Sequence, residues 1–490
     1  MKYIFFSLSL LCGGYLYGQD RSIKIDKVVT TQHQTVIKGQ KITFKATTGT
    51  QPVWDEAGQV IAAVHFTYYK RTDIDQEPMR PLFISFNGGP GSGSVWMHLA
   101  YTGPSILKID DEGFPIQPYG IKTNPYSILD VTDIVFVNPI NTGFSRITDP
   151  ETKRETFFGV NADIKYLAEW LNTFVSRANR WESPKYLIGE SYGTTRVSGL
   201  ALELQEQQWM YLNGVILVSP TRIGIDRSGP VDAANDLPYF TATAWYHRKL
   251  PKNLQEKDLD EILPEVEAYT LNKLIPSLAK GGFISLEEKE AVAKQMAYYS
   301  GLSKQTILDH NLAVPTSFFW KELLRSEGHT VGRLDSRYKG IDRKNAGTSP
   351  DYNSELKSWL HSFTPAVNYY YKNVLNYQTD IKYNMFGPVD PWDRSNNETG
   401  ENLRQAMAEN PYLNVMIQSG FYDGATQYFD AKYTMWQIDP SGRLKDRFRF
   451  EGYRSGHMMY LRKEDLIKAN DDIRDFIKQS TPAAGHPAKY

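Results

Sequence analysis

The feature that most restricts the fold is the segment GESYG at residues 189–193, which follows the apolar run KYLI and precedes a helix-compatible stretch. The glycines on either side of Ser191 fit a tight turn from strand to helix, because bulkier neighbours would collide with the adjoining elements. A bare G-x-S-x-G pattern is common, and a chance loop is the alternative interpretation. The strand before it favours the turn and predicts a sheet in which a strand leads directly into a helix.

Other apolar runs predict further strands of the same sheet. The stretches PLFISF (81–86), DIVFVNP (133–139) and KYLIG (185–189) are rich in β-branched and aromatic residues, as buried parallel strands are. Between the last two, an apolar stripe predicts a helix from Asn161 to Arg177, with Asn161 as its N-cap. Strand, helix and strand in this order indicate an α/β sheet with right-handed crossovers.

The sheet-forming sequence is interrupted by a helical insertion. Charged helical segments replace strand-like runs in the middle of the chain, and strand-like runs return as LNVMIQSG (413–420) and RFRFEGY (447–453). Alternating segments from residue 22 to residue 80 predict antiparallel strands at one edge of the sheet. The predicted organisation is a first sheet part (residues 19–221), a helical cap (222–385), a second sheet part (386–480) and a polar tail (481–490).

The first residues have the layout of a secretory signal peptide. Lys2 is followed by an apolar stretch from Tyr3 to Leu11 and then by small residues, which predicts a signal peptide over residues 1–18. A buried strand and a membrane anchor are the alternatives, but the apolar run is shorter than the ~20 residues that cross a bilayer. Cys12 is the single cysteine, so cleavage leaves no thiol and no disulfide. We therefore expect an exported bacterial protein of the periplasm or the extracellular medium.

The overall charge argues against several classes of partner. Lysine and arginine number 55 and aspartate and glutamate 56, so the formal net charge is −1 and no global field attracts nucleic acid or an anionic membrane. The sequence has no H-E-x-x-H motif, no cysteine pair and no acidic calcium loop. We therefore expect no nucleic-acid partner, no transmembrane span, no metal and no other cofactor.

Ser191 has candidate partners later in the chain. A serine hydroxyl is a weak nucleophile at neutral pH and needs a histidine to take its proton and a carboxylate to orient that histidine. His457, in GYRSGHMM, follows a late predicted strand, whereas the other histidines after Ser191 fall in the predicted cap or the tail. Asp423 stands just past the predicted strand at VMI, although aspartate is also a common turn former. The order Ser191, Asp423, His457 predicts a catalytic triad on an α/β-hydrolase fold, with a mostly parallel sheet and an inserted helical cap.

A glycine-rich loop supplies candidate donors for a developing oxyanion. The segment NGGPGSGS at residues 87–94 follows the predicted strand PLFISF, and acyl transfer uses amide donors from such a loop and from the residue after the nucleophile. The donor candidates are the amides of Gly89 and Tyr192. The loop lacks the ending of a phosphate loop and the spacing of a dinucleotide fingerprint, which leaves a plain flexible loop as the alternative.

Taken together, these segments resemble the serine carboxypeptidase family. NGGPGSGS is similar to the family's NGGPGCSS, VNPINTGFS to its DQPVGTGFS, and GESYG to its GESYGG or GESYAG, while SG-x-x-D (419–423) and GHM (456–458) follow in the expected order. The resemblance implies Ser191 as nucleophile, His457 as general base and acid, and Asp423 as the orienting acid. It also implies that Asn87 and Glu190 bind the free carboxylate of a peptide C-terminus.

Three positions depart from the family pattern. Ser85 stands where well-known members have tryptophan, Phe421 replaces the first aspartate of G-D-x-D, and Tyr101 stands where many members have a glutamate that shares a proton with the equivalent of Glu190. Without that acidic partner, like-charge coupling would not raise the pKa of Glu190. We expect a less acidic pH optimum than is usual for the family.

The predicted function is that of a serine-type carboxypeptidase that acts on peptides with a free C-terminus through an acyl-enzyme intermediate. An esterase or acyltransferase with the same triad is the alternative, because a fold does not fix the substrate. A non-catalytic binding protein on a hydrolase scaffold is a second alternative, and the joint presence of triad and glycine loop argues against it.

Overall fold

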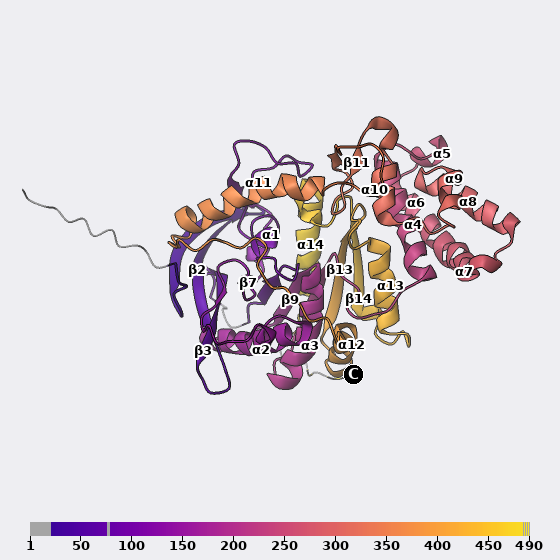
Figure 1. Ribbon diagram of the computed structural model, residues 1–490. Helices are drawn as coiled ribbons and strands as arrows, with labels where there is room; N and C mark the ends of the chain where they lie inside the picture. The colour runs from indigo at the N-terminus through magenta and orange to yellow at the C-terminus, as the bar shows by residue number, and fades with distance from the viewer. Residues whose placement is uncertain (1–20, 76–78, 484, 486, 488, 490) are drawn as a thin grey trace, which may run out of the picture.

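The apolar runs that predict strands lie next to one another in a 10-stranded sheet (Figure 1). The computed structural model describes residues 21–75, 79–483, 485, 487 and 489. The predicted signal peptide at residues 1–18 lies outside them. The strands are β1 (Val28–Ile37), β2 (Gln40–Trp54), β3 (Val60–Arg71), β4 (Leu82–Phe86), β7 (Asp133–Asn138), β8 (Arg146–Ile147), β9 (Lys185–Glu190), β10 (Gly214–Val218), β13 (Asn414–Gly420) and β14 (Phe448–Tyr453).

The sheet is parallel in its central and C-terminal part. Its order is β1-β2-β3-β7-β4-β9-β10-β13-β14, with β8 paired to β3. Neighbours from β7 through β14 run parallel, whereas β1, β2 and β3 are antiparallel and join the rest through an antiparallel β3–β7 pair. The edge region expected from the alternating segments therefore lies beside β7, and the carboxyl ends of the parallel strands meet at one side of the sheet.

Helices cover both faces of the sheet, each over its own apolar cluster (Figure 1). On one face lie α2 (Val160–Arg177), α3 (Tyr192–Gln207), α12 (Thr399–Glu409) and α13 (Tyr428–Ile438). On the other face lie α1 (Val95–His98), α11 (Ser354–Tyr369) and α14 (Lys463–Ser480). Two short hairpins, β5 (Ser105–Leu107) with β6 (Ile121–Thr123) and β11 (Thr330–Val331) with β12 (Lys339–Gly340), lie outside the main sheet.

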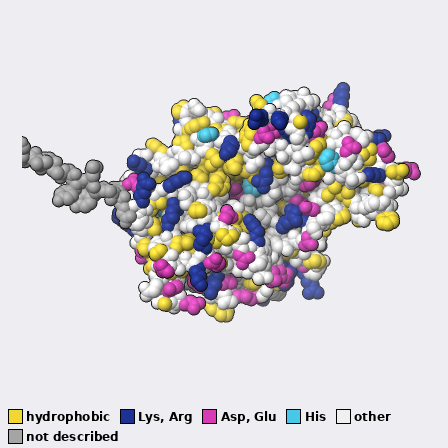
Figure 2. Space-filling model, in the orientation of Figure 1, with side chains coloured by type: hydrophobic (Ala, Val, Ile, Leu, Met, Phe, Trp, Pro, Cys, Tyr) yellow, Lys and Arg dark blue, Asp and Glu magenta, His cyan; other side chains and the backbone are white. Residues whose placement is uncertain are grey.

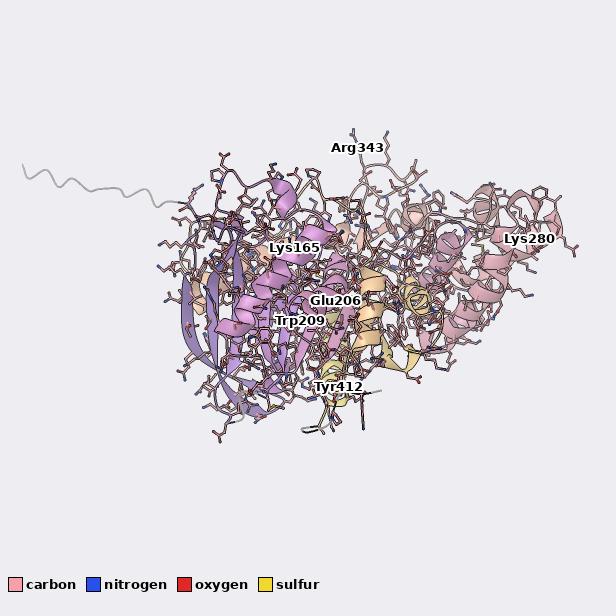
Figure 3. The ribbon with its side chains drawn as sticks, turned by 90° about the horizontal axis from the view of Figure 1, so that it is seen from below. Lys165, Glu206, Trp209, Lys280, Arg343 and Tyr412 are labelled. Carbon is pink, nitrogen blue, oxygen red and sulfur yellow. The ribbon has the colours of Figure 1, made fainter. Side chains whose placement is uncertain are left out.

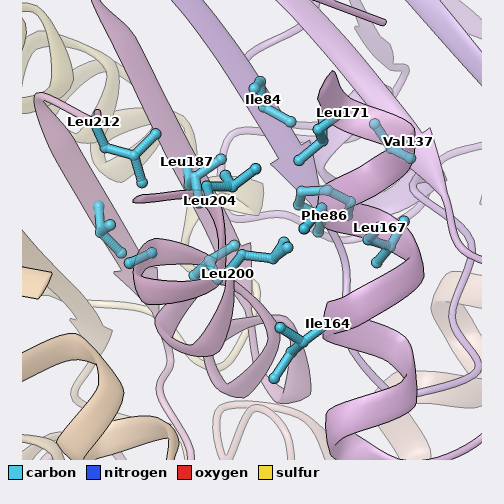
Figure 4. Packing of buried hydrophobic residues seen from close by; sticks show 14 of the residues in the cluster. Ile84, Phe86, Val137, Ile164, Leu167, Leu171, Leu187, Leu200, Leu204 and Leu212 are labelled. Carbon is cyan, nitrogen blue, oxygen red and sulfur yellow. The ribbon is translucent and has the colours of Figure 1, made fainter. Parts of the chain in front are cut away.

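The predicted helix between the second and third central strands is α2, and its apolar stripe packs as the spacing requires. Ile164, Leu167 and Leu171 lie against strand residues and against α3, as Figure 4 shows. Full burial of one such side chain contributes about 1.5–3 kcal/mol to stability. The predicted N-cap is wrong by two residues: α2 begins at Val160, and Gly159 is the cap without a side-chain hydrogen bond.

The cap has an apolar cluster of its own. Its helices are α4 (Pro230–Tyr246), α5 (Lys252–Gln255), α6 (Leu259–Tyr269), α7 (Ile275–Ala279), α8 (Leu286–Ser300), α9 (Lys304–Asp309) and α10 (Thr316–Glu322). Figure 3 places Lys280 at the far end of this cap and Lys165 on the opposite part of the molecule. Helix α11 lies within the sequence range expected for the cap but packs on the sheet, because Trp359, Phe363 and Val367 belong to the sheet's second cluster. Among the described helices, none has the length and apolarity needed to cross a bilayer.

Candidate active site

Ser191 stands on the tight turn that joins β9 to α3. Its backbone has φ 57° and ψ −125°, a region that side chains rarely occupy, and its amide donates to the Val218 carbonyl at 2.9 Å. The flanking glycines are required by space: a Cβ on Gly189 would lie 2.1 Å from the carbonyl oxygen of Gly193, and one on Gly193 would lie 2.8 Å from that of Phe86. The surrounding backbone therefore holds the serine in this strained conformation.

His457 and Asp423 meet although they come from different loops. Nδ1 of His457 lies 2.7 Å from Oδ2 of Asp423, and both side chains are buried. Oδ1 of Asp423 accepts the amides of Ala425 at 2.8 Å and Thr426 at 3.1 Å, and the Thr426 hydroxyl donates to Oδ2 at 2.7 Å. These donors fix the orientation of the carboxyl group toward the imidazole.

The backbone of His457 is held on both sides. Its amide donates to the carbonyl of Leu334 at 2.6 Å, and its carbonyl accepts the hydroxyl of Ser219 at 2.8 Å. Burial lowers the pKa of His457, but the adjacent Asp423 carboxylate outweighs that effect and raises the pKa above 6.5. The imidazole is therefore a stronger base than a buried histidine without a carboxylate would be.

The glycine loop after β4 lies directly against the serine turn. A Cβ on Gly88 would lie 2.5 Å from the amide nitrogen of Tyr192, so a side chain there would collide with this candidate oxyanion donor. The buried guanidinium of Arg196 donates to the Asn87 carbonyl at 2.7 Å and pairs with Asp163 at 2.7 Å. One buried ion pair on the two helices α2 and α3 thus fixes the start of the loop.

Glu190 and Asn87 form a buried polar pair next to the serine. Nδ2 of Asn87 donates to Oε2 of Glu190 at 3.2 Å, and the hydroxyl of Tyr460, in the short turn η8 (Met459–Leu461), donates to the same oxygen. Burial raises the pKa of Glu190 to about 7, against the opposing influence of His457 and of the Tyr460 hydrogen bond. Glu190 therefore carries a proton in mildly acidic solution and can donate it in a hydrogen bond.

The positions that depart from the family pattern have local partners. Tyr101 donates to Oε1 of Gln418 at 2.7 Å, and its ring stacks on that of Tyr460 with centroids 4.7 Å apart. Among the described residues, no second carboxyl group hydrogen-bonds to Glu190. Burial, with a smaller contribution from the charge of Asp423, raises the pKa of Glu190 without a shared proton. The expectation that no like-charge coupling would raise this pKa is therefore wrong. The Ser85 hydroxyl is buried without a partner in the described structure, and Phe421 packs on Tyr428 at 5.0 Å.

One cavity of about 380 Å³ brings most of the predicted site residues together. Its wall includes Asn87, Gly89, Glu190, Ser191, Tyr192 and His457, with Asp423 buried behind the histidine. A second stretch of the wall is apolar and is formed by Trp96, Leu356, Trp359, Phe386 and Met458. In Figure 2 this face of the molecule is hollowed between the sheet part and the cap.

Several residues that shape the site were missed at the sequence level. Thr426, Leu334, Arg196 and Tyr460 contact site residues, but none belongs to a catalytic motif. Thr426 had the one usable signal, because a hydroxyl three residues after an aspartate is often its local hydrogen-bond donor. Over the described part of the chain, no group of three or more His, Cys, Asp or Glu side chains is arranged to hold a metal ion.

Comparison with known proteins shows the family of this chain. A family model described as serine carboxypeptidase matches residues 38–437, which is most of the chain. The chain belongs to the serine carboxypeptidase family. Similar proteins include serine carboxypeptidase-like 36 of Arabidopsis thaliana, 28% identical over 37% of this chain and 35% of that protein. Human retinoid-inducible serine carboxypeptidase is 24% identical over 56% of each chain. The matches thus span between about a third and just over half of these relatives.

A solved structure supports the fold. Kex1(delta)p, a prohormone-processing carboxypeptidase from Saccharomyces cerevisiae, superposes with a TM-score of 0.51 at 15% identity, covering 89% of this chain and 91% of that one. The present chain therefore has the predicted α/β-hydrolase fold with a mostly parallel sheet.

Proposed function

We propose that this protein is a serine-type carboxypeptidase that removes the C-terminal residue from peptides. The observation that carries the proposal is the position of a buried, protonatable carboxyl group in the same cavity as a serine and a carboxylate-bound histidine. Asn87 and Glu190, which are hydrogen-bonded to each other, line this cavity together with Ser191 and His457, and Asp423 contacts the histidine.

The chemistry follows from these roles. Ser191 Oγ attacks the carbonyl carbon of the last peptide bond while Nε2 of His457 takes the hydroxyl proton. The amides of Gly89 and Tyr192 stabilise the negative charge on the carbonyl oxygen. The carbon–nitrogen bond then breaks, and the departing amino group takes the proton from His457, which leaves an acyl-enzyme. Water next gives a proton to His457 and attacks the acyl carbon, and that proton returns to Ser191 as its ester bond breaks.

Recognition of the substrate's free carboxylate is assigned to Asn87 and Glu190. A carboxylate accepts hydrogen bonds and cannot donate them, so both partners must be donors. Asn87 donates through its amide, and Glu190 donates while it is protonated, which its pKa of about 7 permits up to near-neutral pH. A C-terminal amide lacks the negative charge and is expected to be a poorer substrate.

We further propose that the protein is exported, on the basis of the leader-like segment at residues 1–18 and the single cysteine within it. Export would place the enzyme where peptides from outside the cell are available. Its mature form would depend on non-covalent interactions alone for stability, because no disulfide can form.

The test compares three matched compounds with purified wild type and the Ser191→Ala variant. These are an N-blocked dipeptide, its C-terminal amide and a simple ester, and the readout is release of the C-terminal amino acid or alcohol. Selective cleavage of the free acid, lost in Ser191→Ala, is the expected result. Ester cleavage alone, equally dependent on Ser191, would assign the triad to an esterase or acyltransferase. No Ser191-dependent turnover and no fluorophosphonate labelling would leave a binding protein.

A further inference from the structure

The charged groups of the active-site cavity are unbalanced. Apart from His457, its charged lining residues are Glu190, Arg333 and Arg394. Glu190 is buried and hydrogen-bonded by Asn87 and Tyr460, and it is neutral below about pH 7. The exposed wall of the cavity therefore carries positive charge from two guanidinium groups and no compensating carboxylate.

Neither arginine has an acidic partner in the described structure. No described carboxylate lies within the 4.0 Å ion-pair distance of Arg333 or Arg394, and no side-chain hydrogen bond engages either guanidinium. Arg394 lies over the ring of Tyr192, with its guanidinium carbon 5.8 Å from the centroid. Arg333 and His457 line the same cavity, and after the larger influences of burial, Asp423 and Glu190, the charge of Arg333 lowers the pKa of His457.

Other arginines near the site differ in this respect. Arg337, four residues after Arg333, is buried and pairs with Asp335 at 2.6 Å. Arg227 pairs with Asp430 at 3.0 Å, and Arg222 pairs with Asp232 at 2.6 Å. Arg333 and Arg394 thus differ from these three arginines, and both line the cavity that contains Ser191.

A second, polar cavity shows on which side of Ser191 the charge of Arg333 lies. It adjoins the first through Thr221, Arg333, Ala425 and Thr426 and extends under the cap residues Thr316 and Trp320. Its wall contains neither Asn87 nor Glu190. A peptide held by its C-terminal carboxylate at that pair, with its scissile carbonyl at Ser191, must continue away from them. Arg333 therefore lies on the side that receives the acyl part of the substrate.

The second cavity does not supply the missing negative charge. Its carboxylates are Asp232, Asp236 and Asp430. The first and last pair with arginines, and Asp236 accepts a hydrogen bond from Gln427 at 2.7 Å. An acidic group of the substrate is consequently the partner that these unpaired guanidinium groups lack.

We propose that Arg333 and Arg394 form a subsite for an acidic side chain, aspartate or glutamate, on the penultimate residue of the peptide. This inference rests on the proposed carboxypeptidase function and adds a substrate class to it. A guanidinium binds a carboxylate through two parallel hydrogen bonds, so the subsite favours Glu over its neutral isostere Gln. Since both arginines are exposed, screening limits the expected preference in kcat/KM to about fivefold to tenfold.

The experiment measures kcat/KM at low salt for N-blocked Glu-Phe and Gln-Phe, and for the reversed pair Phe-Glu and Phe-Gln. Wild type is expected to prefer Glu-Phe over Gln-Phe and to show no such preference between Phe-Glu and Phe-Gln. The ratio of kcat/KM for Glu-Phe to that for Gln-Phe should fall toward one in Arg333→Gln and in Arg394→Gln. In Arg333→Lys most of the preference for Glu-Phe should remain. Arg333→Glu should invert the ratio and raise the rate on a penultimate lysine.

Arg343→Gln is the matched control. Arg343 is exposed, lies at the edge of the molecule in Figure 3 and lines neither cavity, so its loss should leave the Glu/Gln ratio unchanged. A Glu/Gln ratio of one in wild type, a ratio insensitive to Arg333 and Arg394, or a preference seen at the C-terminal residue instead would overturn the subsite. Absence of all Ser191-dependent cleavage would instead overturn the carboxypeptidase function, so the two failures are distinguishable.

Discussion

Tyr460 donates a hydrogen bond to Glu190 from a ring that stacks on Tyr101, with centroids 4.7 Å apart. A phenol and an aromatic stack thus occupy the surroundings in which the family pattern has a second carboxyl group. A phenol stays protonated across the working pH range, so it cannot share a proton as a paired acid does. The protonation of Glu190 is instead controlled by burial.

The pH dependence of free-acid hydrolysis should follow Glu190. Its carboxyl group is protonated below its pKa of about 7 and loses the proton as the pH rises through that value. We expect kcat/KM for a blocked dipeptide acid to fall roughly tenfold per pH unit above that point, while the C-terminal amide shows no such fall. His457 must be neutral to act as base, and its raised pKa limits the acid side, so the optimum should lie near pH 7.

The Glu190→Gln variant is the control for this profile. Glutamine donates at every pH, so the alkaline fall should disappear for the acid substrate. A wild-type profile that peaks below about pH 5, near the pKa of an unperturbed glutamate, would contradict the assignment.

Removal of the Tyr460 hydroxyl should move the alkaline limit upward. The hydrogen bond from Tyr460 favours the ionised form of Glu190 and lowers its pKa, so Tyr460→Phe raises that pKa further. We expect the fall in acid hydrolysis to shift by about one pH unit to higher pH. Tyr101→Phe is the matched variant, because its hydroxyl contacts Gln418 and not Glu190. Equal shifts in both variants would argue against the specific contact.

Thr426 should act as a positioning residue for the triad. Its hydroxyl donates to Asp423 at 2.7 Å, so Thr426→Val removes a donor from the carboxylate that orients His457. We expect kcat/KM and the rate of fluorophosphonate labelling of Ser191 to fall together by about tenfold, the value of one charge-assisted hydrogen bond. Thr426→Ser keeps the hydroxyl and should retain most of both rates. Similar losses in the two variants would assign the effect to packing.

The buried pair of Arg196 and Asp163 should be important for stability. Both side chains are at most 1% exposed, and Arg196→Met leaves the charge of Asp163 buried without a partner. We expect a loss of about 3–5 kcal/mol in the free energy of unfolding by urea. Arg222→Met breaks the exposed pair with Asp232 and should cost less than about 1 kcal/mol. Similar losses in the two variants would show that the buried pair contributes no more to the free energy of unfolding than the exposed pair does.

Local patterns in the sequence were sufficient for the central strands and for the serine turn. The strands before Ser191 and before Asp423 are short apolar runs that can be recognised without knowledge of their neighbours. Chain order then related Ser191, Asp423 and His457, which the structure places around one cavity or directly behind its wall. Their catalytic roles remain predictions that the experiments above address.

Contacts between distant segments could not be predicted in this way. The hydrogen bond from His457 to Leu334 joins backbone groups, which have no side-chain signature in the sequence. The stripe of α11 is visible as a periodic pattern, but periodicity shows which face is apolar and not which layer covers it. For the same reason, residues of α11 were expected in the cap although they pack on the sheet.

The cap's separate apolar cluster has a consequence for how specificity can be changed. That cluster ends at Val331, whereas Leu334, which holds the amide of His457, packs with the sheet. Residues 230–331 could therefore be exchanged with those of a relative, provided that the crossover point precedes Leu334 and that Tyr422, Tyr428 and Phe429, which pack against α4 and α6, are exchanged with them. Recombination inside this boundary would alter the wall of the second cavity, which the cap residues Thr316 and Trp320 line, while a crossover beyond it would also disturb the support of the His457 imidazole.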